Sequence, residues 1–453
     1  MQKDDLTTGT MTSHFRAIAI PAALGMLFTT LYNVVDVYWA GRVSTDAQAG
    51  LAIGYQAFFV LMAVGFGLGS ALSALVSNAK GSGDGTQTQQ LSAQGLTFGI
   101  IVTLGSIVVG WIIGPMLIKL VSEPGAYRDA ALGYYKVLLF ALPGFFLTFA
   151  GNGILQAHGD SRTMQRGMMA AFFVNIGLNP LMMFGIPSVW GGIGFNGIAV
   201  STIICQTGVM LFVLSRIFKL DMMRDVTPSA FRPARNSFRQ ITAQLVPASS
   251  AMIVMFFSGF VVQFALKSFG GPAVAAYSVA LRIEQILLLP VLGMTGALLP
   301  IAGQNFGKKD FDRVRAAIKF CWTTGFIMTA IAAPILLFAG SHVMALFSDD
   351  PEVIAIGTSY LRVDAFLFPL YMMLFSITSL LQALKRPIWT LWLSLYRQGF
   401  GVAFFIWVFI GLLDFSVWGV WLGIAAAVSS GWVIAMFAVR HVTKTEIGGL
   451  IKA

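Results

Sequence analysis

The chain has 453 residues, of which 57% are hydrophobic and only 11% are charged. Soluble domains carry about 25% charged residues, so this composition excludes an ordinary soluble protein and predicts several membrane crossings. The net charge of +10 does not indicate nucleic-acid binding, because Lys and Arg in membrane proteins mainly report orientation.

Twelve continuous apolar stretches are long enough to cross a bilayer as helices, which predicts an all-α polytopic membrane protein and argues against a β-barrel. They cover residues 16–40, 52–77, 91–117, 133–157, 163–186, 193–217, 240–266, 274–302, 316–340, 357–383, 388–413 and 416–440. Lys and Arg concentrate at both termini and in the even-numbered connections. This bias predicts a multi-pass protein of the plasma membrane, such as a bacterial inner membrane, with both termini in the cytoplasm.

The first acidic residue inside an apolar stretch is Asp36. A carboxylate at membrane depth costs ~2.5–3.5 kcal/mol on insertion scales, so such residues usually bind, pair or carry a proton. Tyr32 and Asn33 precede Asp36 by four and three residues, which places all three near one helical face. A carboxyl group removed from water takes up a proton more readily than one in water, which makes Asp36 a candidate proton carrier.

One proline lies early in the first stretch of each half of the chain: Pro21 in the N-terminal half and Pro247 in the C-terminal half. A proline removes a backbone hydrogen bond and bends a helix. The sequence leaves two interpretations open, a static packing kink and a hinge whose bend changes with the state of Asp36.

Further amides and hydroxyls occur in the fourth to sixth stretches. Asn152 and Gln156 are four residues apart in the fourth stretch, Asn175 and Asn179 repeat this spacing in the fifth, and Thr202 lies in the sixth. Together with Asp36 they could hold a proton or an oxygen-liganded cation. For any single amide, a role as an interhelical hydrogen-bonding contact is an equally physical alternative.

The two halves of the chain repeat each other at an offset of 226 residues. This offset superposes Pro21 on Pro247, Tyr134 on Tyr360, and Leu155-Gln156-Ala157 on Leu381-Gln382-Ala383. Each half has six stretches, so the repeat is parallel, and two six-helix bundles suit alternating access. We therefore expect an N-terminal lobe over 1–217, a cytoplasmic linker over 218–239 and a C-terminal lobe over 240–453. Asp36 has no acidic counterpart, because the offset lands on Val262.

The C-terminal half carries its own charges inside apolar stretches. Arg282 and Glu284 lie in the eighth, Asp364 in the tenth near its outer end, and Arg397 in the eleventh. We interpret them as pairing with one another. The chain contains no hydrolase triad, metal-ligand cluster or nucleotide motif, so we expect neither an enzyme nor a cofactor.

With these features the chain resembles the multidrug and toxic compound extrusion (MATE) family. The parallel six-helix halves match, and Gly153 to Asp160 follows the family's "G-x-L-Q-A-x-G-D" signature. The resemblance covers residues 14–440 and is greatest to the DinF-like branch. It implies an N-lobe cation site, with the following members here: Asp36, Pro21, Asn175 and Asn179, together with Tyr32 and Thr202.

Two departures from the family pattern bear on the coupling ion. Some relatives have a second aspartate where this chain has Asn179, and the single carboxylate favours a proton over sodium. The NorM-like branch has acidic residues in the seventh and tenth helices, whereas the seventh stretch here has none, which argues against coupling in the C-terminal lobe.

The expected function is a proton-coupled antiporter that exports amphipathic, often cationic, organic compounds. Its expected partners are these small molecules and the lipid bilayer, not nucleic acid, and it is expected to act as a monomer. A sodium-coupled antiporter and a flippase for lipid-linked precursors remain alternatives within transport. A channel or receptor is a further alternative, against which the repeat and the lone buried carboxylate argue.

Overall fold

The computed structural model describes residues 5–186 and 188–450. Within these residues, twelve helices are long and apolar enough to cross a membrane, which confirms the predicted all-α polytopic fold. Most of them extend beyond the apolar stretch that predicted them. A helix satisfies its backbone hydrogen bonds internally and can continue into water, whereas an apolar stretch marks only the part that suits hydrocarbon.

The chain folds as two compact units, and their boundaries fall inside two helices. The first unit includes Pro21–Ser249, and the second combines Leu6–Ile20 with the chain from Ser250 onward. The predicted linker, 218–239, belongs to the first unit, where it contributes two short helices that pack on α3 (Gly85–Val121).

Two long helices therefore change unit along their length. Helix α1 (Met11–Val43) does so at Pro21, and α9 (Arg235–Lys267) does so just after Pro247. Each proline lies inside its helix and removes one i to i−4 hydrogen bond. The first and ninth helices thus have their weakest backbone bonding close to the point where they pass from one unit to the other.

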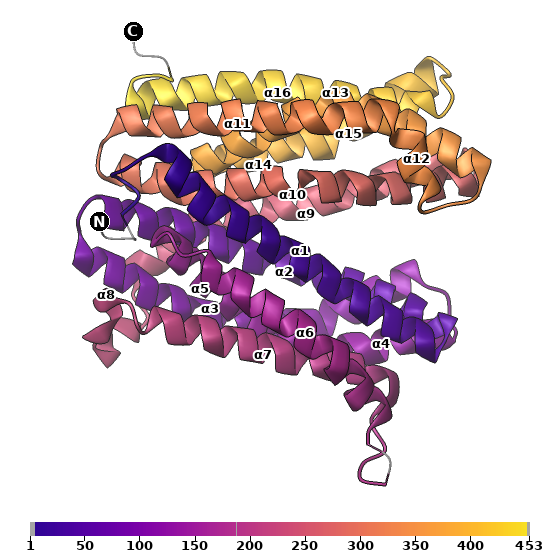
Figure 1. The fold of residues 1–453 in the computed structure, drawn as a ribbon, viewed down its shortest axis with the longest axis horizontal. Coiled ribbons are helices and arrows are strands. Elements are labelled where there is room, and N and C mark those ends of the chain that lie inside the picture. Colours follow the sequence, from indigo (N-terminus) through magenta and orange to yellow (C-terminus); the bar gives the residue numbers. More distant parts are fainter. Residues whose placement is uncertain (1–4, 187, 451–453) are drawn as a thin grey trace. The chain divides into compact units, whose positions relative to one another are not determined.

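The first unit is built around α2, which packs against α3, α4 and α5, while α7 packs on α5 and α6 (Figure 1). Its elements are α2 (Thr45–Gly81), α3 (Gly85–Val121), α4 (Ala126–Leu138), η1 (Leu139–Ala141), α5 (Leu142–Ala157), α6 (Arg162–Phe184), η2 (Gly194–Asn196), α7 (Gly197–Ile217), α8 (Asp221–Arg224) and η3 (Pro228–Phe231). A Cβ atom on Gly153 of α5 would collide with the backbone carbonyl of Gly69 in α2. Glycine at this position therefore permits the close approach of the two central helices.

The second unit has a similar core, in which α10 packs against α11 and α13, and α13 packs against α16. Its elements are α10 (Gly271–Gly307), α11 (Phe311–Phe338), α12 (Gly340–Ala345), α13 (Pro351–Ala383), α14 (Ile388–Ser394), η4 (Leu395–Gly401), α15 (Val402–Ile406), η5 (Trp407–Leu412) and α16 (Trp418–Ile447). The η4 and η5 stretches are π-helical. Such stretches often occur at functional sites.

The chain before α1 is fastened within the second unit. The backbone N–H of Leu6 donates to Oε1 of Gln304 at 2.9 Å, and its carbonyl accepts from Nδ2 of Asn305 at 3.1 Å. Arg313 donates to the carbonyl of Gly9 at 3.0 Å. The start of α1 is therefore held by side chains of α10 and α11.

Candidate functional site

The structure brings Asp36 of α1 together with the two asparagines of α6. Nδ2 of Asn175 donates to Oδ1 of Asp36 at 3.0 Å, and Nδ2 of Asn179 donates to the same oxygen at 2.8 Å. The two asparagines also bond to each other at 3.1 Å. Asp36 is 5% exposed and both asparagines are fully buried, so this carboxylate is held by amide donors away from water.

The hydroxyl of Tyr32 donates to Oγ1 of Thr202 in α7 at 3.2 Å, and both side chains are buried. Tyr32 lies one helical turn before Asp36, so α1 faces α6 through its carboxylate and α7 through its tyrosine. Thr202 also lies beside Asp36. Within the described residues, Asp36 forms no ion pair with a basic side chain.

Two further tyrosines belong to this cluster, and sequence reasoning did not assign them to it. Tyr55 of α2 lies beside Asn33 and interacts electrostatically with Asp36. Tyr134 of α4 is buried and also interacts with Asp36. The available signal for Tyr134 was its repeat partner, Tyr360, since a tyrosine retained in both halves marks an equivalent position.

The remaining predicted polar residues lie elsewhere. Asn152 and Gln156 are partly buried in α5, and in the described part of the chain neither hydrogen-bonds to the Asp36 cluster. Oδ1 of Asn152 is buried and has no hydrogen-bond partner there. Pro21 lies inside α1, at the point where this helix changes unit.

The second unit contains a separate group of buried charged residues. Glu284 of α10 is 8% exposed and accepts a 2.5 Å hydrogen bond from the hydroxyl of Tyr360 in α13. Asp364, one turn after Tyr360, is fully buried and interacts electrostatically with Glu284. Arg397 of η4 also interacts electrostatically with Glu284.

This group corrects one expectation. Asp364 lies inside α13, which begins at Pro351, and is fully buried. The expected direct pairing is wrong, because in the described residues no ion pair joins Arg282, Glu284, Asp364 and Arg397. Glu284 takes its hydrogen bond from a tyrosine instead, and Arg397 acts on it from a greater distance.

The fold and the site define a polytopic helical membrane protein that is built from a duplicated six-helix unit. Its first unit contains a buried cluster of polar residues around the carboxylate of Asp36. A model of the MatE family matches residues 21–181 and again 247–407. The two matches are offset by the same 226 residues as the repeat in the sequence, and together they cover most of the chain. The chain therefore belongs to the MatE family.

Curated relatives are similar over four fifths of the chain or more. A probable multidrug resistance protein, YoeA, of Bacillus subtilis (strain 168) is 25% identical over 439 residues, which cover 95% of this chain and 87% of the relative. The multidrug export protein MepA of Staphylococcus haemolyticus (strain JCSC1435) is 23% identical over 81% of this chain and 80% of its own length.

Solved structures share the fold. A transporter of the MOP superfamily from Pyrococcus furiosus, described as having a binding pocket of reverse polarity, superposes with a TM-score of 0.90 at 22% identity. That match covers 100% of this chain and 99% of the other. A multidrug resistance MATE transporter in an outward-facing conformation gives a TM-score of 0.88 at 22% identity, over 98% and 99% of the two chains.

Proposed function

We propose that the protein exports amphipathic, often cationic, organic compounds in exchange for protons, by alternating access. Membership of the MatE family and the multidrug names of its curated relatives support the export of drugs. The buried Asp36 cluster supports the exchange for an ion. In this proposal the protein acts as a monomer in the plasma membrane, with both termini in the cytoplasm and without a resident cofactor.

The observation that carries the proton assignment is the orientation of the two asparagine amides. Both turn their Nδ2 donors toward Oδ1 of Asp36, an arrangement that suits an ionised carboxylate. Hydrogen bonds to a charged acceptor are roughly twice as strong as neutral ones. Protonation of Asp36 removes its charge and therefore weakens both of its hydrogen bonds to α6 at once.

Protonation of Asp36 changes how firmly α1 is held. Once Asp36 is protonated, α1 is held less firmly against α6, and the helix bends at Pro21, where its backbone bonding is weakest. The bend reshapes the drug cavity and expels the compound, and release of the proton restores the two amide bonds. The exchange is coupled because binding of the proton causes release of the drug, and release of the proton restores the state that binds the drug.

Sodium is the alternative coupling ion. A sodium site needs several converging oxygen ligands, whereas the asparagines present nitrogen donors to the carboxylate. Residues Tyr32 and Thr202 are already bonded to each other. A flippase for lipid-linked precursors would need a cationic site for pyrophosphate, and the cluster around Asp36 offers a carboxylate with no paired basic side chain in the described residues.

The test is drug transport in proteoliposomes with an imposed pH gradient or an imposed sodium gradient. Asp36→Asn keeps the size of the side chain and one acceptor oxygen but cannot ionise. We expect it to abolish pH-driven exchange, while Asp46→Asn, at an exposed position at the start of α2, behaves like the wild type. Transport by Asp36→Asn with unchanged pH dependence contradicts the proposal, and transport driven only by sodium selects the alternative.

A further inference from the structure

The connection between α6 and α7 is unusual in lacking charge. The sequence contains no charged residue between Arg166 and Arg216, although every other connection expected on the outer side has one at or beside it, such as Glu123 or Asp349. Figure 1 shows this connection extending past the end of α6. Exposure to water alone does not account for the lack of charged residues in this connection.

The backbone of this connection is closed by its own hydrogen bonds. Ile186 and Trp190 form an antiparallel bridge, in which Ile186 donates at 2.8 Å and Trp190 at 3.0 Å. The N–H of Val189 donates to Ile186 at 3.1 Å, and the N–H of Ile193 donates back to Met182 of α6 at 3.0 Å. Polar backbone groups that are satisfied internally can enter an apolar environment without a large desolvation penalty.

Two glycines restrict the shape of the part of this connection from residue 185 to 192, which we call the hairpin. Gly185 has φ 75° and Gly192 has φ 72°, values that other residues rarely adopt. A Cβ atom on Gly185 would collide with the carbonyl of Trp190. The hairpin is therefore a compact turn that rests directly on the end of α6.

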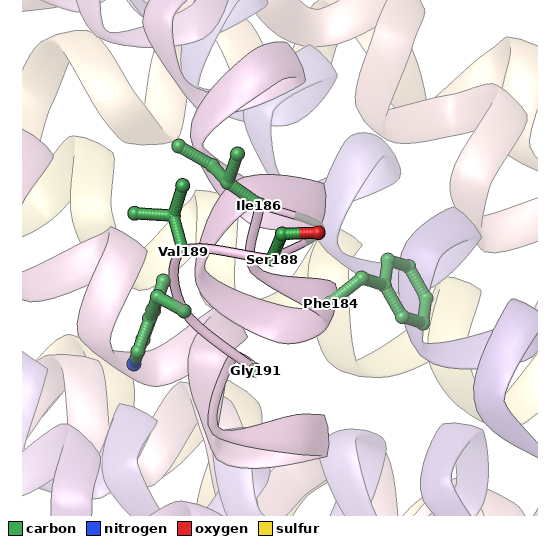
Figure 2. A pocket seen from close by; sticks show the side chains of 6 residues that line it. Phe184, Ile186, Ser188, Val189 and Gly191 are labelled. Atoms are coloured by element: carbon green, nitrogen blue, oxygen red, sulfur yellow. The ribbon is translucent and has the colours of Figure 1, made fainter.

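Three of the described side chains of the hairpin are apolar and exposed, and Ser188 between them is polar and exposed. Val189 is 78% exposed, Ile186 47%, and Trp190 38%. Figure 2 shows Ile186 and Val189 directed to one side of the turn and Phe184 to the other. These residues line a hollow of about 360 Å³. An exposed apolar cluster of this kind marks a surface that contacts a membrane or a partner.

The adjoining helices α6 and α7 also carry exposed apolar side chains. Phe173 of α6 is 61% exposed and Leu211 of α7 is 59% exposed, as expected for side chains that face acyl chains. Trp is enriched where a membrane meets water, because its ring is apolar and its N–H is polar. The environment that suits the hairpin is thus the boundary of the same bilayer that surrounds α6 and α7.

We propose that this hairpin is an interfacial anchor, which inserts Ile186, Val189 and Trp190 into the outer leaflet of the bilayer. The anchor sets the depth of α6 and α7. These helices carry Asn175, Asn179 and Thr202, so the hairpin holds the partners of Asp36 and Tyr32 at a fixed level while α1 moves.

Fluorescence quenching tests the depth of the hairpin without requiring transport. The full-length protein carrying Val189→Cys is labelled with a thiol-reactive, environment-sensitive dye and reconstituted into phosphatidylcholine and phosphatidylglycerol vesicles. The quenchers are nitroxides on lipid acyl chains and iodide on both sides of the membrane. The wild-type chain, whose Cys205 and Cys321 are buried, gives the labelling background.

The matched control is Thr86→Cys, at an exposed position in the first turn of α3. We expect the nitroxide lipids to quench the dye at residue 189 several-fold more strongly than the dye at residue 86, and iodide to show the reverse order. Equal quenching of both dyes by iodide, with no effect of the nitroxide lipids on residue 189, places the hairpin in water and overturns the proposal. Because neither measurement depends on coupling, a failure of the anchor is distinguishable from a failure of proton exchange.

Discussion

The hydrogen bond from Nδ2 of Asn179 to Oδ1 of Asp36 is 2.8 Å long, and the bond from Nδ2 of Asn175 to the same oxygen is longer, at 3.0 Å. The bond from Asn179 joins α1 to α6 at a fully buried position. A hydrogen bond to a charged group contributes about 1.5–3 kcal/mol, and in the proposed cycle this bond forms and weakens at each turnover.

The variant Asn179→Leu removes this donor and keeps a similar volume. We expect the rate of pH-driven drug efflux to fall roughly tenfold or more, because the ionised carboxylate loses a bond worth about 1.5–3 kcal/mol. Initial rates in proteoliposomes across a range of pH measure the effect. Asn152→Leu is the control, since Oδ1 of Asn152 has no hydrogen-bond partner in the described residues. If both variants change the pH profile equally, the role assigned to Asn179 is wrong.

Replacing the proline of α1 tests the hinge. The variant Pro21→Ala restores a backbone hydrogen bond, and a proline inside a helix costs ~3 kcal/mol. We expect slower efflux with an unchanged or raised Tm, because α1 then resists bending although the fold is intact. Pro115→Ala, at a proline inside α3, controls for the general effect of removing a proline. Wild-type efflux by Pro21→Ala would show that the kink is static.

The sequence predicted the twelve spans because each must present an apolar run of membrane length, and it predicted the duplication because the offset holds along the chain. It also predicted that Asn175 and Asn179 share a face, since residues four apart are neighbours on a helix. The spacing could not show that this face meets Asp36, because the contact depends on how α1 and α6 pack. The same limit explains why Tyr55 and Tyr134 were missed.

The C-terminal charges show a different limit. The apolar run that contains Asp364 begins at residue 357, whereas the helix begins at Pro351 and ends with the run at Ala383, so the run alone does not give the bounds of the helix. Tyr134 and Tyr360 are repeat partners, and each lies beside a buried carboxyl group, Asp36 in one unit and Glu284 in the other. The repeat therefore preserves the tyrosine while the carboxylate comes from a different helix.

A double-mutant cycle on Arg397 and Glu284 tests whether the buried charges of the second unit depend on one another. Arg397→Met leaves two buried carboxyl groups without a nearby cation, so we expect a Tm several degrees below that of the wild type. Adding Glu284→Gln removes one of these charges and is expected to restore part of the loss, with a coupling of ~1 kcal/mol or more. Arg362→Met, at an exposed position of α13, is expected to leave Tm unchanged. Additive effects of the two substitutions would show that the charges act independently.

The histidine that follows α5 predicts a pH-dependent stability. Nδ1 of His158 bonds to the carbonyl of Ile154 at 2.9 Å. Burial, with a smaller contribution from the charge of Lys80, lowers the pKa of His158 to about 4. The unfolded chain therefore binds a proton more readily than the folded one between the unfolded pKa of ~6.5 and the folded pKa. The stabilising effect of a neutral His158 is complete above the unfolded value and is lost as the pH falls toward about 4.

The variant His158→Gln removes this titration and is expected to flatten the decline in stability at acidic pH. From pH 7.5 to pH 5, the wild type should lose about 2 kcal/mol more than the variant. Thermal unfolding of the purified protein at the two pH values measures the difference. His342→Gln, at an exposed position of α12, should follow the wild type. Equal acid sensitivity of His158→Gln and the wild type would mean that His158 is not the group whose protonation destabilises the fold.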